Sequence, residues 1–433
     1  MTFPLARLGL VALATMLMPL PALAADTLNS GDTAWIIAAT ALVLFMTLPG
    51  LALFYAGLVR SQAVLSVIMQ CVGIACLATI LWLVVGYSLA FGDSVGGWIG
   101  NLDKAFFAGV TPDVLSGSIP EIVFAVFQMT FAIITPALIV GAYVERIKFS
   151  SVLIFSGAWL LLVYAPVCHW VWGGGWLSEL GVMDFAGGIV VHATAGVSAL
   201  VIAMMLGERR GFPDQVRPPH NPGMTATGAA MLWVGWYGFN GGSQLAADGG
   251  AGMAIAATHI AAATAGMVWM IIEWVKFGKP SLVGAVTGVI AGLATVTPAS
   301  GFVGPMGGLI LGVAAAVVCF YAVQLIKHKM KIDDSLDVFA VHGVGGILGS
   351  LMVSALALAA FGGGGLAEGQ TVVGQLGVQA LGVGVTLVWS AVLTVVILKI
   401  TGLLTGGLRV DEDQEIEGLD LASHGERGYD LGR

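Results

Sequence analysis

The sequence predicts an all-α polytopic membrane protein with eleven transmembrane helices, arranged as a 5+5 inverted repeat plus one extra helix. Three observations predict this fold. The chain of 433 residues is 58% hydrophobic and only 10% charged, whereas soluble domains carry about 25% charged residues. Long, almost uncharged stretches recur along it. Two of these stretches, separated by five spans, each carry a histidine in a similar context.

The first 24 residues are predicted to be a secretory signal peptide, not a span. Arg7 supplies a positive charge, Leu8 to Leu20 form a short apolar stretch, and Ala22 to Ala24 match the A-x-A pattern of cleavage sites. About 13 apolar residues are too few to cross a bilayer. We therefore expect residues 1–24 to be cleaved and the new N-terminus to be periplasmic or extracellular.

Eleven later segments are long and apolar enough to cross a hydrocarbon core of about 30 Å. All should be helices, because lipid offers no partner to unpaired backbone groups. They cover residues 33–59, 63–92, 121–144, 149–168, 186–207, 223–246, 250–272, 281–298, 302–326, 337–361 and 371–400. The transmembrane domain is then 25–404, with repeats at about 33–207 and 223–361 and the extra helix at 371–400.

Lysine and arginine gather on one side of this topology. The loops after odd-numbered spans hold Arg60, Arg146, Lys148, Arg209, Arg210, Arg217, Lys276, Lys279, Lys327, Lys329 and Lys331. The opposite loops hold only Lys104. Such a bias marks the cytoplasmic side and agrees with an exported N-terminus. We therefore expect a protein of the cell inner membrane whose C-terminus is cytoplasmic.

Residues 405–433 form a tail of different composition, with eight acidic residues against three arginines. Composition alone favours a solvated, partly disordered tail. The alternative is a docking segment for a cytoplasmic regulator.

Two histidines, His192 and His342, lie within apolar spans, in the contexts "DFAGGIVVH" and "DVFAVH" that begin at Asp184 and Asp337. An ionisable group in a membrane is costly and usually faces a pathway. Because five spans separate them, the two helices run in opposite directions, as in transporters whose pathway lies between inverted repeats. The pair could relay protons, ligate a metal or haem, or line a pore for a neutral molecule. A metal would need further ligands, which the inner spans do not offer.

Aromatic residues gather at the expected outer ends of three spans, in "HWVWGGGWL" around Trp172, in "FQMTF" from Phe127 to Phe131, and in "WYGFNGGS" ending at Ser243. Some of them fit an interfacial aromatic belt. Aromatic faces without basic neighbours also suit a cation, which gains roughly 0.5–2 kcal/mol there, and Ser243 adds an acceptor. Asp184 and Asp337 fit equally well as helix N-caps or as cation ligands.

Seven motifs in order resemble the ammonium transporter (Amt/Mep/Rh) family, and its bacterial Amt branch most closely. They are "MTLPGLALFYAGLVR", "FAIITPALIVGAYVERIKFS", "HWVWGGGWL", "DFAGGIVVH", "GWYGFNGGS", "GAVTGVIAGLATVTPASGFV" and "DVFAVHGVGGILG". The resemblance covers almost the whole mature chain. It implies a homotrimer with one pore per subunit and no enzymatic activity, cofactor, metal or nucleic-acid partner.

The resemblance also assigns residues, one by one. It places an outer recruitment site at Trp172, Phe127 and Ser243, a stacked gate at Phe131 and Phe239, and twin pore histidines at His192 and His342. Asp184 matches a buried aspartate near the recruitment site, and Thr297 matches a pore-side position. The tail resembles a segment that docks a PII-type signalling protein. Met129, Thr130 and Pro136 depart from the family pattern beside Phe131.

The predicted function is ammonium transport, with methylammonium as an analogue. Ammonium binds at the outer aromatic site and loses a proton, and ammonia passes the twin histidines. The proton is either relayed separately or returned outside. Three other functions stay open: an ammonium sensor, a haem-bearing electron-transfer subunit, and a proton-coupled carrier for another small substrate.

Overall fold

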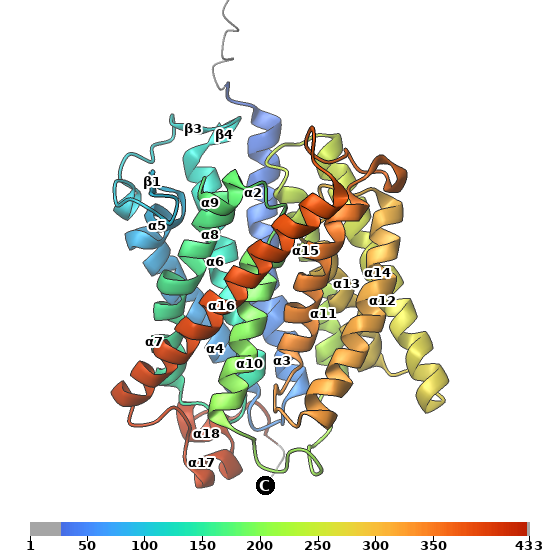
Figure 1. Cartoon of the computed structure of the whole chain (residues 1–433). Coiled ribbons are helices and arrows are strands. Elements are labelled where there is room, and N and C mark those ends of the chain that lie inside the picture. Colours follow the sequence, from blue (N-terminus) through green and yellow to red (C-terminus); the bar gives the residue numbers. More distant parts are fainter. Residues whose placement is uncertain (1–26, 431–433) are drawn as a thin grey trace, which may run out of the picture.

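The computed structural model describes residues 27–430, so the predicted signal peptide at 1–24 lies outside the described residues. Within 27–430, nine helical segments are long and apolar enough to cross a membrane by length and composition. They stand side by side in one bundle (Figure 1). Several are α-helices continued by a π-helical turn, which widens the helix locally without ending it.

Five of these segments lie in the first half of the chain. They are Ser30–Leu58 (α2, Ser30–Phe45; η1, Met46–Leu51; α3, Ala52–Leu58), Val64–Phe91 (α4, Val64–Leu81; η2, Trp82–Gly86; α5, Tyr87–Phe91), Glu121–Tyr143 (α6), Phe149–Glu179 (α7, Phe149–Trp159; η4, Leu160–Tyr164; α8, Ala165–Trp172; α9, Trp176–Glu179) and Gly188–Leu206 (η5, Gly188–Ala193; α10, Thr194–Leu206). The later ones are Gly249–Phe277 (α12), Pro305–Lys329 (α14, Pro305–Gln324; η7, Leu325–Lys329), Phe339–Leu356 (η8, Phe339–Gly343; α15, Val344–Leu356) and Val372–Leu404 (α16).

Two of the eleven expected spans are helical but do not meet that criterion. α11 (Pro222–Trp236), continued by η6 (Tyr237–Gly241), is rich in glycine, threonine and tryptophan, which lowers its mean hydropathy. α13 (Leu282–Val296) has 15 residues, about 22 Å of helix against a hydrocarbon core of about 30 Å. The predicted ranges ran past both helices because the flanking loops are also uncharged. The helical architecture is confirmed, while crossing by all eleven helices stays a prediction.

Short polar side chains cap the N-termini of several helices by accepting hydrogen bonds from backbone amides of the first turn. Asn29 accepts from the amides of Gly31 and Asp32 at the start of α2, and Asp248 accepts from Ala251 at the start of α12. Thr371 does the same for α16. These caps satisfy amides that have no partner within the helix, so the start of each helix is set by its local sequence.

Two small hairpins lie between α5 and α6, on what we call the hairpin face of the bundle. β1 (Ser94–Val95) pairs with β2 (Ile99–Gly100), and β3 (Leu115–Ser116) pairs with β4 (Ile119–Pro120), both antiparallel. These short strands are the exception to the all-α prediction. β3 and β4 stand at this end of the bundle (Figure 1).

The two histidine-bearing helices begin in the same way. The Asp184 carboxylate accepts four backbone hydrogen bonds, from the amides of residues 187 to 190 at the start of η5. At the start of η8, the Asp334 carboxylate accepts from the amide of Phe339 at 2.7 Å. Asp184 precedes His192 by eight residues, and Asp334 precedes His342 by the same number.

The N-cap alternative for Asp337 at the second histidine helix is therefore wrong. Asp337 occupies the position that Gly187 has in the first half, and both have a positive φ, 61° and 114°. The Asp337 carboxylate accepts from Lys327 Nζ at 2.9 Å instead. Matching the "VH" pairs directly, without allowing for this left-handed turn, aligned the wrong aspartate.

The two histidine-bearing helices run in opposite directions. At one end, the Arg209 amide just after α10 donates to the Asp333 carboxylate just before η8, at 2.8 Å. At the other end, the Gln379 side chain of α16 accepts a hydrogen bond from the Met183 amide, before η5, and donates one to the Ser350 carbonyl, in α15. This antiparallel arrangement agrees with an inverted repeat.

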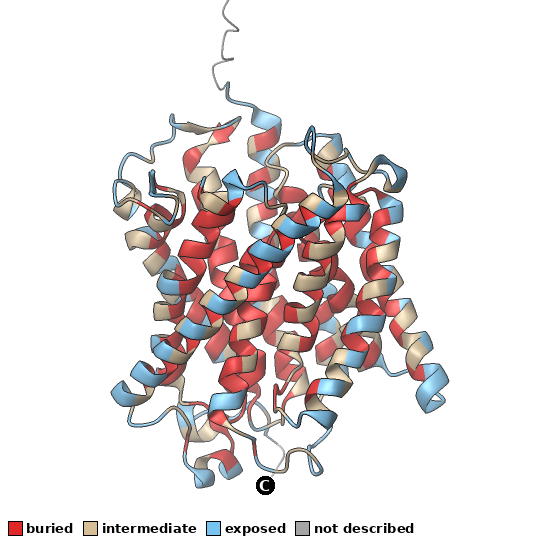
Figure 2. Ribbon diagram, viewed as in Figure 1, coloured by how far each residue is buried: buried red, intermediate tan, exposed pale blue. Residues whose placement is uncertain are grey.

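The core lies along the middle of the bundle, and the exposed residues mark its outer helices (Figure 2). Small residues let the histidine-bearing helices touch. A Cβ on Gly196 would lie 2.2 Å from the Cα of Gly343, so this close crossing requires glycine. α16 crosses obliquely over the other helices (Figure 1) and packs on α7, α10 and α15, as expected of an added helix.

The tail folds back on the end of the bundle opposite the hairpins, which we call the tail face (Figure 1). It forms α17 (Glu412–Glu417) and α18 (Leu419–His424). Glu415 is buried and accepts from the Arg210 amide at 2.8 Å and from Arg409 Nη2 at 2.7 Å. Asp420 accepts from the Ser66 amide at 2.7 Å, in the first turn of α4. The expected partly disordered tail is therefore wrong for residues 405–430, because its acidic side chains have specific partners.

Candidate substrate pathway

A cavity of about 410 Å³ opens between the helices at the hairpin face. No charged side chain lines it. Its lining is aromatic, aliphatic or uncharged polar: Phe91, Ser116, Phe124, Gln128, Phe131, Val171, Trp172, Phe185, Ser243 and Leu245. Three of the predicted site residues, Trp172, Phe131 and Ser243, are thus brought together. The cavity can hold a small cation against aromatic faces and neutral oxygens.

The two predicted gate residues close the inner end of this cavity. The rings of Phe131 and Phe239 have centroids 4.2 Å apart, and both side chains are almost fully buried. Trp172 stands edge-on against Phe131, at 5.9 Å and 89°. Because Phe131 lines the outer cavity and Phe239 the next one, the ring pair is a partition between them.

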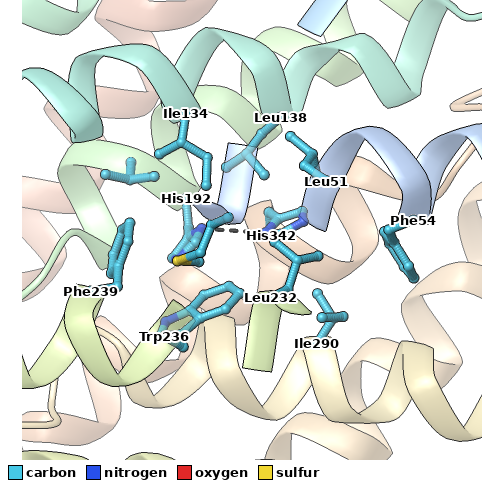
Figure 3. A pocket seen from close by; sticks show the side chains of 12 residues that line it. Leu51, Phe54, Ile134, Leu138, His192, Leu232, Trp236, Phe239, Ile290 and His342 are labelled. Carbon is cyan, nitrogen blue, oxygen red and sulfur yellow. Dashed lines mark hydrogen bonds between the residues drawn. The ribbon is translucent and has the colours of Figure 1, made fainter. Parts of the chain in front are cut away.

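Beyond the partition lies a central cavity of only about 10 Å³ around the two histidines. His192 stacks on Phe239, with centroids 6.2 Å apart, and on His342, at 5.2 Å. Figure 3 shows the two imidazoles joined by a hydrogen bond and surrounded by Leu51, Ile134, Leu138, Leu232 and Ile290. This space is close to the minimum for one water molecule, so it has room for about one molecule of that size.

The histidine pair shares one hydrogen bond. The two Nδ1 atoms lie 3.3 Å apart, so one must carry a proton and the other must not. The two rings are therefore opposite tautomers. His192 Nε2 is buried and has no partner, which leaves it free to bond a molecule in the central cavity.

A third cavity, of about 210 Å³, opens at the tail face. It shares Phe54, Ile290 and His342 with the central cavity, so the two are adjacent. Unlike the outer cavity, it carries charged groups: Arg209, Arg217, Lys327 and Asp337. The three cavities and the Phe131–Phe239 partition form one series between the two faces of the bundle.

Buried charges brace this third cavity. Arg146 is fully buried and its Nη2 donates to the carbonyl of Asp333 at 2.8 Å. Burial lowers the pKa of Arg146 to about 10, and the Asp333 carboxylate opposes that shift. Burial, with the negative charge of Asp337 beside it, raises the pKa of Asp334 to about 7. Arg146 thus stays charged at neutral pH, whereas the Asp334 carboxyl keeps its proton to a much higher pH than an exposed carboxyl does.

Three predicted site residues do not line any of the three cavities. Phe127 is buried behind the gate, with its ring 5.1 Å from that of Phe131. The Asp184 carboxylate is occupied by backbone amides, and the Asp184 carbonyl accepts from Trp172 Nε1 at 2.8 Å. Thr297 Oγ1 accepts from Trp236 Nε1 at 2.9 Å. Each of the three holds a neighbouring aromatic side chain in place.

The three residues that depart from the family pattern beside Phe131 fit within α6. Thr130 is buried, and its hydroxyl donates to the Phe127 carbonyl at 2.6 Å. Met129 is partly buried against the core. Pro136 lies inside α6, which nevertheless continues to Tyr143.

Trp236 and Gln128 are among the lining residues that the sequence-based assignment missed. Trp236 stacks on His192 at 5.6 Å and 25°, and Gln128 lines the outer cavity. Both stand within motifs that the sequence had marked, "WYGFNGGS" and "FQMTF". An amide inside an apolar helix is itself a signal, because a buried polar group needs a partner.

The geometry disfavours haem between the histidines. A haem plane would have to separate the two rings, which are in direct hydrogen-bond contact. Within residues 27–430, no group of three or more His, Cys, Asp or Glu side chains could hold a metal ion.

Residues 34–429 match the model of the Ammonium Transporter Family. The ammonium transporter of Aquifex aeolicus is 45% identical over 410 residues, which is 93% of this chain and 94% of that protein. Among solved structures, a protein named Sensor Amt Protein aligns with a TM-score of 0.85 and 31% identity, over 91% of this chain and 98% of that one. Mep2 of Candida albicans aligns with a TM-score of 0.82 and 35% identity, over 90% and 88%.

Proposed function

Since the chain belongs to the ammonium transporter family and is a multi-pass membrane protein, we propose that it carries ammonium through the three cavities in series. The observation that carries this proposal is the unbroken aromatic column between them. Trp172 contacts Phe131, Phe131 contacts Phe239, Phe239 contacts His192, and His192 contacts His342.

The first step is recruitment at the hairpin face. Ammonium enters the outer cavity and rests against the faces of Trp172 and Phe131, where cation–π attraction is worth about 0.5–2 kcal/mol. The Ser243 hydroxyl donates to the Phe239 carbonyl at 2.8 Å, which leaves its oxygen free to accept from the cation. Phe127 and Asp184 act at this site by holding its aromatic side chains, and Thr297 does the same for Trp236 beside His192.

The second step is loss of a proton before the central cavity. A charge inside the bilayer costs about 2.5–3.5 kcal/mol on insertion scales, and the apolar lining around the histidines offers little compensation. Ammonium avoids that cost by deprotonating, which potassium cannot do. The acceptor of the proton is His192 Nε2, directly behind Phe239 at the entrance of the central cavity, and neutral ammonia then passes the histidines.

The proton crosses separately through the histidine pair. It binds Nε2 of His192 while the Nδ1 proton of His192 moves to Nδ1 of His342, and the Nε2 proton of His342 leaves toward the third cavity. Each transfer reverses the direction of the hydrogen bond between the rings. The original direction must be restored before the next proton can cross. Ammonia and proton rejoin at the tail face, so one positive charge moves with each ammonium.

We extend the proposal to the topology. All eleven helices cross the cell inner membrane as a 5+5 inverted repeat plus α16. The signal peptide is cleaved, the hairpin face is periplasmic and the tail face is cytoplasmic. The matched Asp184–His192 and Asp334–His342 pairs support the repeat. The chain assembles as a homotrimer, and the folded tail offers a surface to a PII-type protein.

Ammonium-evoked current on the purified protein in lipid vesicles tests the proposal. A second candidate is an ammonium sensor, favoured by the likeness to the protein named Sensor Amt Protein. A transporter gives current that grows with the ammonium gradient. A sensor binds ammonium without current.

A further inference from the structure

Gln128 is the one polar side chain of the outer cavity that is nearly buried and has no hydrogen bond. It is 8% exposed, and its Oε1 has no partner. It lies in α6 three residues before Phe131, so the two side chains share a helix face. Both line the same cavity as Trp172 and Ser243.

A buried amide without a partner is unusual, because protein interiors satisfy nearly all such groups. The other polar groups around the cavity differ from it. Trp172 Nε1 donates to the Asp184 carbonyl, and the Ser243 hydroxyl donates to the Phe239 carbonyl. Ser116 stands at the rim, on strand β3, and is partly exposed. Among the polar residues that line the outer cavity, Gln128 is therefore the one whose side chain lacks a hydrogen-bond partner within the protein.

A terminal amide can exchange its oxygen and nitrogen by a half turn, without moving the rest of the side chain. The amide oxygen is an acceptor with two lone pairs. Ammonium carries four N–H donors in a tetrahedral arrangement, and aromatic faces satisfy them only weakly. A cation in this cavity therefore gains most from neutral oxygens, because no carboxylate lines the cavity.

We propose that Gln128 is a substrate-binding and specificity residue, whose amide oxygen accepts a hydrogen bond from ammonium in the outer cavity. This inference rests on the proposed function. It adds a second oxygen beside Ser243, so that the site recognises a small cation that donates hydrogen bonds. Because the interaction precedes deprotonation, it governs binding more than the rate of passage.

The test compares Gln128→Met with a matched control, Gln70→Met, on purified protein. Methionine keeps the length of the side chain and removes its hydrogen bonding. Gln70 in α4 is also buried with an unpartnered Oε1, but it lines none of the three cavities. Two quantities are measured: the KM and maximal value of ammonium-evoked current in vesicles, and the Kd for ammonium chloride by calorimetry in detergent.

We expect Gln128→Met to raise KM and Kd about tenfold, the equivalent of losing about 1.4 kcal/mol, with maximal current within about twofold of wild type. Gln70→Met should leave KM and Kd unchanged. Gln128→Glu should lower KM at neutral pH, and this gain should disappear as acid protonates the new carboxylate.

The inference is overturned if Gln128→Met binds ammonium as wild type does, or if it lowers only the maximal current, as a packing defect would. It is also overturned if Gln70→Met has the same effect. If wild type shows neither ammonium uptake nor current, the transport proposal fails, while the calorimetric comparison still decides whether Gln128 binds ammonium.

Discussion

His192 and His342 share a single hydrogen bond between their Nδ1 atoms, at 3.3 Å, from helices that run in opposite directions. One ring donates and the other accepts, so the two are chemically unlike although their positions are matched. This relationship makes the pair one functional unit, and it governs the first prediction.

Replacing either histidine should reduce the ammonium-evoked current as much as replacing both. In a shared proton path, removal of one member breaks the whole path, so the effects are not additive. We expect His192→Ala, His342→Ala and the double variant to lose ammonium-evoked current to the same low level, measured in vesicles with matched protein content. His259→Ala, at an exposed histidine of α12, should keep wild-type current. Undiminished current that still excludes potassium in the double variant would rule out the relay.

Opening the aromatic partition should reduce selectivity against potassium. Phe131→Ala or Phe239→Ala joins the outer and central cavities, so water and a hydrated cation can enter. We expect the ratio of ammonium to potassium conductance to fall about tenfold or more, in keeping with loss of a barrier of a few kcal/mol. Phe155→Ala removes an equally buried ring from α7 and should leave the ratio unchanged. An unaltered ratio in both gate variants would show that the partition does not select ions.

Loss of the Asp184 carboxylate should destabilise the protein more than loss of an ordinary cap. Four backbone amides depend on it, so Asp184→Ala should cost about 2 kcal/mol, the upper end of measured caps. Asp248→Ala, which removes an acceptor from one amide of α12, is the control. We expect a larger fall in melting temperature in detergent for Asp184→Ala. Equal falls would contradict the assignment of Asp184 as a multiple cap.

Asp334 should make stability depend on pH. Burial raises its pKa to about 7, above the ordinary value of about 3.9, so the folded protein favours the protonated form. Its contribution is fully present at acid pH and is lost as pH rises through about 7. We expect the melting temperature of wild type, relative to Asp334→Asn, to fall between about pH 4 and pH 7 and to level off above. A constant difference over that range, or a rise, would contradict the shift.

Much of the helical fold could be predicted, because an apolar segment in lipid must pair its own backbone groups, and a helix does so. What could not be predicted depends on contacts between distant segments. Asp334 caps its helix through a left-handed turn at Asp337 that no periodicity reveals. The tail looked disordered by composition, yet Glu415 and Asp420 accept hydrogen bonds from the backbone amides of Arg210 and Ser66, each more than 200 residues away, and Glu415 also accepts from the nearby Arg409 side chain.

The site was predictable to a similar extent. The histidines stood out because ionisable groups are costly in membranes, and Phe131, Phe239 and Trp172 stood out through the family resemblance. The sequence could not show that Phe127 and Thr297 act from behind the lining, since that depends on which way each side chain faces. Gln128 and Trp236 were overlooked beside more familiar neighbours.

The most direct test of the central claim, that ammonium gives up its proton before crossing, compares currents evoked by ammonium, methylammonium and potassium in vesicles of the purified protein. The account predicts current with ammonium and methylammonium and none with potassium, although the potassium ion is of similar size. Potassium current as large as that of ammonium would show that intact cations cross. Ammonium uptake without current would show that the proton does not.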